Sequence, residues 1–142
     1  MRDEPSPHAD GAIDLVVVGA HLTGMPLNHE LTALGGRLID QTSTTPDYRL
    51  FELAGARPSK PGMLRVKEGA GARIEVEVWR LAPAAFGAFV SRIPSPLGVG
   101  TVRLDDGRRL KGFLVEAIAV EGARDVSDFG GWRAYCASLV AD

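Results

Sequence analysis

Apolar residues recur at short, alternating intervals along this chain, a pattern that predicts more strands than helices. The clearest predicted strand covers residues 73–81, where every second residue from Ile74 to Val78 is apolar. Glu75 and Glu77 share the opposite face of this strand. Two neighbouring carboxylates can do acid–base work, but they also occur on ordinary solvated strand faces. The pattern favours the solvated face.

Shorter signals predict the other elements. Segments rich in Leu, Ile, Val and Thr predict further strands at residues 15–18, 37–45, 48–53, 62–67, 101–104 and 108–120. The strands at 37–45 and 48–53 would form a hairpin around Pro46-Asp47. Apolar residues at helical spacing predict helices at residues 28–34, at 83–93 and from Ser127 or Asp128 onward.

Turn-forming and capping residues mark where these elements begin and end. Asn28 is expected to cap the first helix, because its side chain can accept a hydrogen bond from a free N–H group. The run Asp105-Asp106-Gly107 is expected to turn a hairpin. Gly112 would mark a β-bulge in the returning strand. Residues 94–100 would form a stiff loop, since they contain two prolines and two glycines.

The order of these elements favours an α+β fold. Strands follow one another mostly as hairpins rather than alternating with helices, which indicates a mixed, curled sheet or small barrel with about three flanking helices. Phe86, Phe89, Trp132 and Leu139 are expected to be buried against the sheet. Cys136 shares its helical face with Trp132 and Leu139, and we expect a small core residue there rather than a nucleophile.

Composition narrows the classes of function. The 142 residues suit one domain at 13–142, and a polar leader at 1–12 that is expected to be flexible precedes it. The formal net charge of -2 gives no reason to expect nucleic acid or an anionic membrane as partner. A single cysteine excludes an internal disulfide and a cysteine-based metal cluster. No apolar run approaches the roughly 18 residues of a transmembrane helix, so a cytoplasmic protein is expected.

Residues 15–28 carry the most suggestive chemistry. A short apolar strand leads into a glycine-bearing loop and then a helix start, and both can offer free N–H groups to an anion. His21 lies in this loop, and an unperturbed imidazole exchanges its proton at a pH of about 6.5. The segment lacks the Gly-x-Gly-x-x-Gly pattern and the Walker lysine, so a plain strand–helix turn with an incidental histidine stays open.

Several separated motifs together resemble the C-terminal domain of allophanate hydrolase. They are GAHLTGMPLN (19–28), YRLF (48–51), KPGMLRV (60–66), IEVEVW (74–79), IPSPLGVG (93–100) and FGGWRAY (129–135). The resemblance runs over nearly the whole chain, from residue 15 to residue 141. It implies a γ-glutamyl cyclotransferase-like fold, in which the loop after the first strand binds substrate through its N–H groups.

The resemblance also implies a role in urea breakdown. In that family an amidase domain converts allophanate to N-carboxycarbamate, and the C-terminal domain converts this small dianion towards carbon dioxide and ammonia. It implies a histidine base, which is His21 here, with His29 as the second match on the helix exterior. Neither a cofactor nor a metal is implied. The expected substrate-binding residues are Gly19, Ala20, Leu22, Thr23, Gly24, Met25, Pro26, Leu27, Asn28, Tyr48, Lys60, Pro94, Pro96, Leu97 and Gly98.

Two departures from the family pattern leave an alternative open. The amidase half and its nucleophile are absent from this sequence, so the chain alone should not hydrolyse allophanate. Residues 93–98 hold no carboxylate where a γ-glutamyl cyclotransferase carries its catalytic glutamate, which argues against cyclotransferase chemistry. The alternative is a non-catalytic assembly or regulatory module that partners a separate amidase. The oligomeric state stays open.

Overall fold

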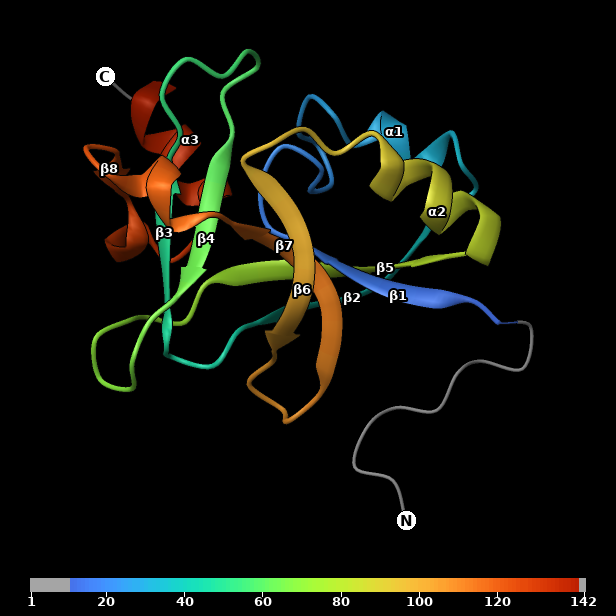
Figure 1. Ribbon diagram of the computed structural model, residues 1–142, viewed down its shortest axis with the longest axis horizontal. Coiled ribbons are helices and arrows are strands. Elements are labelled where there is room, and N and C mark those ends of the chain that lie inside the picture. Colours follow the sequence, from blue (N-terminus) through green and yellow to red (C-terminus); the bar gives the residue numbers. More distant parts are fainter. Residues whose placement is uncertain (1–10, 141–142) are drawn as a thin grey trace.

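Two β-sheets organise the molecule (Figure 1). The computed structural model describes residues 11–140. The larger sheet has the strand order β2-β5-β1-β7-β6, formed by β1 (Ile13–Val17), β2 (Arg37–Ser43), β5 (Glu75–Leu81), β6 (Leu97–Arg103) and β7 (Arg109–Val115). In this sheet β1 and β7 run parallel and the other neighbours antiparallel. The sheet is therefore mixed, as predicted.

The smaller sheet is antiparallel and has the strand order β4-β3-β8. Figure 1 shows its central strand β3 (Tyr48–Glu52) between β4 (Pro61–Arg65) and the short β8 (Arg124–Asp125). β4 packs against β7 of the larger sheet. A Cβ added to Gly62 of β4 would lie only 2.8 Å from the Val115 side chain of β7, so a larger residue would push the sheets apart.

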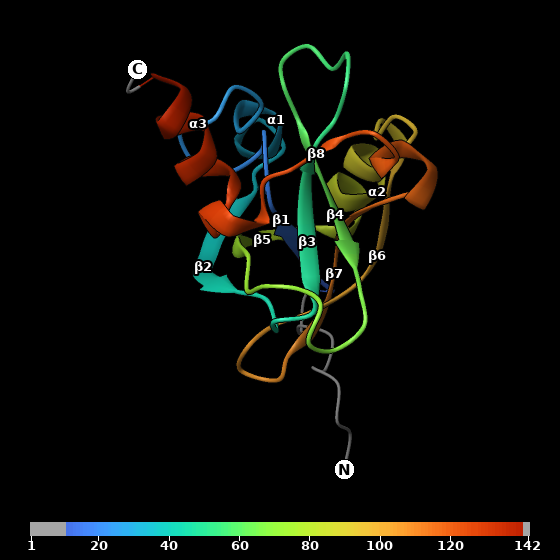
Figure 2. The same cartoon turned by 90° about the vertical axis from the view of Figure 1, so that its left-hand side faces the viewer.

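Three α-helices lie at the margins of the sheets. They are α1 (His29–Thr32), α2 (Pro83–Ser91) and α3 (Trp132–Val140), with 3-10 turns at Ala117–Val120 and Ser127–Phe129. Figures 1 and 2 both place α1 and α2 on the same side of the larger sheet. The α+β prediction is confirmed, and the sheets stay open rather than closing into a barrel. The predicted leader lies mostly in residues 1–10, outside the described residues.

The core fills the space between the two sheets and under the helices. Leu15, Tyr48, Ile74 and Val78 are fully buried there, and so is Trp132 of α3 with an exposure of 1%. Apolar burial of this extent is the main force that favours the folded chain. Phe89 is buried as predicted, whereas Phe86 and Cys136 are half-buried and pack against the core.

The predicted hairpin between residues 37–45 and 48–53 is wrong. β2 pairs with β5, while β3 pairs with β4 and β8, so the turn at Pro46-Asp47 carries the chain from one sheet to the other. Two strands that follow each other in the sequence often form a hairpin. Here β2 instead pairs with β5 and so belongs to the larger sheet, whereas β3 belongs to the smaller one. The hairpin at residues 105–107 is confirmed, because β6 and β7 pair in unbroken register on either side of it.

The predicted bulge at Gly112 is also wrong. Gly112 pairs with Gly100 without a register shift, and the irregularity lies instead between Leu38 and Asp40 of β2. Gly112 is glycine for a different reason, which is crowding. A Cβ there would lie 2.7 Å from Val16 of β1 and 2.7 Å from Val102 of β6.

Several predicted boundaries move. The returning strand ends at Val115 rather than residue 120, and Leu97–Arg103 is a strand where residues 94–100 were expected to be a loop. Ser127 does not cap α3, which begins at Trp132; its hydroxyl accepts the Leu50 N–H group at 2.8 Å. Leu139 is 53% exposed rather than buried, and Tyr135 is the α3 residue that is buried alongside Trp132.

Candidate functional site

His21 lies in the loop between β1 and α1, with its imidazole held between two aromatic rings. The Phe113 ring of β7 stacks on it at 5.4 Å between centroids, with an interplanar angle of 9°. Phe89 of α2 meets it edge-on at 5.0 Å. Aromatic packing of this kind fixes the plane of the ring and excludes water from its faces. His21 is therefore a restrained side chain, with 14% of it exposed, although it belongs to a loop.

Polar contacts fix the imidazole further. Nε2 of His21 lies 2.7 Å from Oε1 of Glu30. Because an ionised carboxylate only accepts hydrogen bonds, Nε2 carries the ring hydrogen and Nδ1 is left as the acceptor. Asn28 donates its Nδ2 hydrogen to the His21 carbonyl at 2.8 Å. Asn28 therefore closes the loop, and the prediction that its side chain caps α1 is wrong.

The surroundings of His21 favour its neutral form. Burial lowers the pKa of the imidazole, and the nearby charges of Lys60 and His29 lower it further. Glu30 acts in the opposite direction but does not cancel these effects, so the pKa lies below its usual value of 6.5. At neutral pH His21 is thus a neutral base with a free lone pair on Nδ1.

A cavity of about 180 Å³ opens beside His21. Drug-sized ligands occupy pockets of roughly 300–1,000 Å³, so this one suits a molecule of few atoms. Its lining comes from the His21 loop, α1 and the turn after it, α2 and the segment that follows it, the start of β6, β7 and the residue before β4. The lining residues are His21, Leu27, Glu30, Leu34, Lys60, Phe89, Arg92, Ile93, Pro94, Leu97 and Phe113.

The charged groups of the cavity favour an anion. Lys60 and Arg92 contribute two positive charges against the single negative charge of Glu30. The N–H groups of Ala20 and His21 have no hydrogen-bond partner within the part of the chain that the structure describes. Free N–H groups and cations that lie close together are the usual elements of a carboxylate site, and Ala20 lines a hollow that adjoins the cavity.

The structure brings together part of the predicted site. His21, Leu27, Lys60, Pro94 and Leu97 line the cavity. An adjoining hollow shares His21, Lys60 and Leu97 with the cavity and adds two more predicted residues, Gly19 and Ala20. Pro96 lines a groove further out, which also shares Lys60.

Other predicted residues lie elsewhere. The Tyr48 side chain is fully buried in the core, where its hydroxyl accepts the Arg103 N–H group at 3.0 Å. Leu22 is fully buried beneath the loop, and Met25 packs against the core. Thr23, Gly24, Pro26 and Gly98 are exposed, and neither they nor Asn28 line the cavity.

Sequence reasoning missed Glu30, Arg92 and Phe113 as parts of the site. Glu30 reads as a first-turn acid at a helix N-terminus, and Arg92 follows the last residue of α2. Phe113 is one of several apolar residues on a strand. These side chains meet around one cavity only because α1, α2 and β7 lie close to the His21 loop in the folded chain. The position of Glu30, nine residues after His21 and in the first turn of the helix, is the one available signal.

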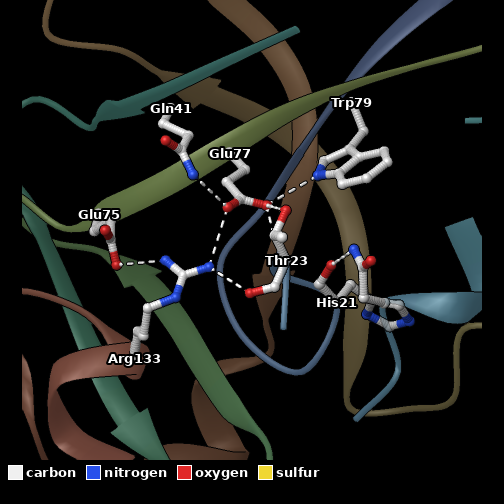
Figure 3. A network of polar contacts seen from close by, with 8 residues as sticks. His21, Thr23, Gln41, Glu75, Glu77, Trp79 and Arg133 are labelled. Carbon is white, nitrogen blue, oxygen red and sulfur yellow. Dashed lines mark hydrogen bonds and ion pairs between the residues drawn. The ribbon is translucent and has the colours of Figure 1, made fainter. Parts of the chain in front are cut away.

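Glu77 also differs from its prediction as part of a solvated strand face. The pattern favoured a solvated strand face, but the Glu77 side chain is completely buried. Figure 3 shows it among Thr23, Gln41, Trp79 and Arg133, all within hydrogen-bonding distance. Strand alternation alone cannot identify this burial, because α3 and the His21 loop cover that face of β5. Glu75 on the same face is partly exposed and pairs with Arg133.

No group of three His, Cys, Asp or Glu side chains in residues 11–140 is placed to hold a metal ion. None of the helices in this range is long and apolar enough to cross a membrane.

Comparison with known proteins gives a consistent set of relatives. Urea amidolyase of Saccharomyces cerevisiae is 41% identical over 127 residues, which make up 87% of this chain and 7% of that protein. The solved allophanate hydrolase of Kluyveromyces lactis is 35% identical with a TM-score of 0.87, over 94% of this chain and 22% of that one. A solved uropathogenic Escherichia coli-specific protein is 34% identical with a TM-score of 0.81, over 89% of this chain and 96% of that one.

More distant likeness concerns the fold alone. An AIG2-like protein of Mus musculus superposes with a TM-score of 0.57 at 13% identity, in agreement with the predicted γ-glutamyl cyclotransferase-like fold. The family model described as the allophanate hydrolase C-terminal domain matches residues 13–137, nearly all of the described chain. This chain is a member of the allophanate hydrolase C-terminal domain family.

Proposed function

We propose that this domain hydrolyses N-carboxycarbamate, the dianion that an amidase forms from allophanate. One observation carries the proposal: a neutral, restrained imidazole, His21, opens onto a small cavity that also holds Lys60 and Arg92. The full-length relatives are named as urea amidolyase and allophanate hydrolase, and this chain spans only 7% and 22% of their lengths.

Recognition would use the charges around the cavity. N-carboxycarbamate carries a carboxylate at each end of a central nitrogen. Lys60 and Arg92 would each neutralise one carboxylate, and the free N–H groups of Ala20 and His21 would donate to the end nearer the loop. Charge-assisted hydrogen bonds of this kind are stronger than neutral ones, because the acceptor carries a full charge.

His21 would act first as a base and then as an acid. Its Nδ1 takes a proton from a water molecule as the water oxygen attacks one carboxyl carbon. The carbon–nitrogen bond then breaks, its electron pair passes to nitrogen, and the imidazolium returns the proton to that nitrogen. The products are bicarbonate and carbamate, and carbamate decays to ammonia and carbon dioxide. Acid–base help of this kind contributes about 10²–10⁴-fold.

A partner that supplies the substrate follows from the same proposal. The proposed reaction needs an amidase that releases N-carboxycarbamate from allophanate. In urea amidolyase and allophanate hydrolase the matching segment is a small part of a larger chain, whereas it makes up 96% of the Escherichia coli relative. A partnership with an amidase therefore suits both this proposal and the alternative in which the domain only assembles with that amidase.

The test compares two histidine variants in single turnover. N-carboxycarbamate is generated from allophanate by an amidase, and carbon dioxide plus bicarbonate is measured with and without the domain. His21→Asn should lower the domain-dependent rate by about 10²–10⁴-fold, because the base is gone. His29→Asn is the matched control and should keep the wild-type rate, since His29 is exposed and does not line the cavity.

Either of two results would contradict the proposal. One is an equal rate for wild type and His21→Asn with both chains folded. The other is no acceleration by the wild-type domain over the spontaneous reaction. Both results would favour the non-catalytic module, and a pull-down of the amidase by the domain would then show whether the two assemble.

A further inference from the structure

We infer that Glu77 is a positioning residue that holds the His21 loop in place through Thr23. Arg133 of α3 binds the same loop residue, and the clamp consists of these two side chains, Glu77 and Arg133. This inference rests on the proposed function of His21. Nothing in the sequence pattern points to it, because Glu77 reads as one member of a solvated strand face.

The Glu77 carboxylate accepts five hydrogen bonds inside the protein. Oε1 accepts from the Thr23 N–H group at 2.9 Å, from the Thr23 hydroxyl at 3.0 Å and from the Trp79 indole at 3.0 Å. Oε2 accepts from Gln41 at 3.0 Å and from Arg133 at 3.1 Å. Figure 3 shows these donors arriving from the loop, β2, β5 and α3.

The Glu77 carboxylate keeps its negative charge although it is buried. Burial raises the pKa of the Glu77 carboxyl, but hydrogen bonds from Gln41, Thr23 and Trp79 outweigh it and lower the pKa below its usual value. A buried charge without partners would be strongly unfavourable, so the five donors and the acceptor hold one another in fixed positions.

Arg133 holds the same loop residue by its other backbone group. Its Nη2 atom donates to the Thr23 carbonyl at 2.7 Å as well as to Glu77, and its Nη1 atom donates to Glu75 at 3.2 Å. Thr23 is thus fixed at its N–H, its hydroxyl and its carbonyl. The two anchors come from β5 and α3, which lie 54 and 110 residues away from Thr23 along the chain.

The clamp acts on His21 through a short piece of backbone. Only Leu22 separates His21 from Thr23, and Leu22 is itself fully buried. Glu77 does not line the cavity and does not touch the imidazole. Its loss should therefore displace the base without removing the cations that hold the anion. A misplacement of about 1 Å in a catalytic group can cost about 10²-fold in rate.

The experiment measures the rate and the binding separately in matched variants. Glu77→Gln removes the charge and leaves an amide hydrogen facing the donor of Gln41 or Arg133. Gln41→Ala is the control, because it removes one hydrogen bond to the same carboxylate and leaves the hydrogen bonds from Thr23 in place. Each variant is measured for single-turnover rate, for malonate affinity by calorimetry, and for the ring ¹⁵N resonances of His21.

The expected result separates the two variants. Glu77→Gln should lower the rate by about 10- to 10²-fold and shift the His21 ring resonances, with malonate affinity within about threefold of wild type. Gln41→Ala should stay close to wild type in all three measurements. A folded Glu77→Gln variant with unchanged ring resonances overturns the inference.

Two further variants keep the test decisive if Glu77→Gln does not fold. Thr23→Val removes the hydroxyl donor and keeps the N–H group, and Arg133→Lys removes the forked contact and keeps the charge. Wild-type rates and ring resonances in both would overturn the inference. Failure of the proposed function can be told apart from failure of this inference. If the proposed function is wrong, His21→Asn keeps the wild-type activity. The ring resonances of His21 still report whether Glu77 positions His21.

Discussion

His21 owes its proposed chemistry to neighbours that come from three other parts of the chain. Phe89 and Phe113 remove water from the ring, which lowers the pKa of the imidazole. Glu30 binds Nε2 and so directs the free lone pair to Nδ1. An isolated histidine in a loop would have none of these properties, and half of it would be protonated near pH 6.5.

The lowered pKa of His21 predicts a loss of stability in mild acid. Between the lowered pKa of folded His21 and a pH of about 6.5, the histidine is protonated in the unfolded chain but stays neutral in the folded chain. The free energy of unfolding therefore falls as the pH drops below about 6.5. It levels off once the pH is below the folded pKa. Urea unfolding at pH 7.5 and pH 5 should therefore show a larger loss for wild type than for His21→Asn. Equal losses in the two proteins would contradict the lowered pKa.

At the scale of elements, glycines on the β6–β7 hairpin show how crowding decides a residue type. Gly112 lies on β7 between β1 and β6, where a Cβ would lie 2.7 Å from a side-chain carbon on either side. Gly98 lies on β6 of the same hairpin, and a Cβ there would meet nothing within 4 Å. The sequence predicts a loop around Gly98 and a strand around Gly112, and neither prediction indicates how crowded the two positions are.

The difference in crowding predicts that adding one methyl group destabilises the fold more at Gly112 than at Gly98. Gly112→Ala should lower the free energy of unfolding by about 1–3 kcal/mol, because neighbouring strands cannot separate locally. Gly98→Ala should change it by less than about 0.5 kcal/mol, as surface substitutions usually do. Urea unfolding of both variants checks the pair. A Gly112→Ala variant as stable as Gly98→Ala would mean that β1, β6 and β7 lie further apart than described.

Much of the element content could be predicted, and much of the pairing could not. Strand β5, helix α2 and the β6–β7 hairpin follow from local signals, which are alternation, helical spacing and a glycine turn. The partner of β2 depends on which strand covers it best, and no local signal states this. The same limit applies to the site: His21 and Lys60 could be proposed from motifs, but Arg92 could not.

At the scale of the whole molecule, the charge around the cavity differs in sign from the charge of the chain. The formal net charge is -2, whereas the cavity holds Lys60 and Arg92 against Glu30 alone. A small dianion is therefore attracted locally although the protein as a whole repels it. Salt weakens such attraction when the charges are exposed to solvent.

This local charge predicts that malonate stabilises the folded protein. Malonate resembles N-carboxycarbamate in its two carboxylates, and a ligand present at 100 times its Kd adds about 2.7 kcal/mol to the free energy of unfolding. The Tm should rise with malonate for wild type and rise much less for Lys60→Met. Lys67→Met is the control, because Lys67 is exposed and does not line the cavity.

An equal rise in Tm for Lys60→Met and wild type would contradict the assignment of the anion to this cavity. Acetate, which has one carboxylate, should give a smaller rise than malonate at the same concentration. A rise that is the same for both anions would indicate general ion effects rather than a site.

The sequence alone determined the fold class, the buried strand β1 and the loop that carries His21. These features depend on residues close together in the chain, whose periodicity and turn chemistry act locally. The tertiary structure alone decided that Glu77 is buried, that Tyr48 is a core residue and that Glu30 binds the imidazole. Burial and charge pairing depend on what covers a side chain, and the covering elements here are far away in the sequence.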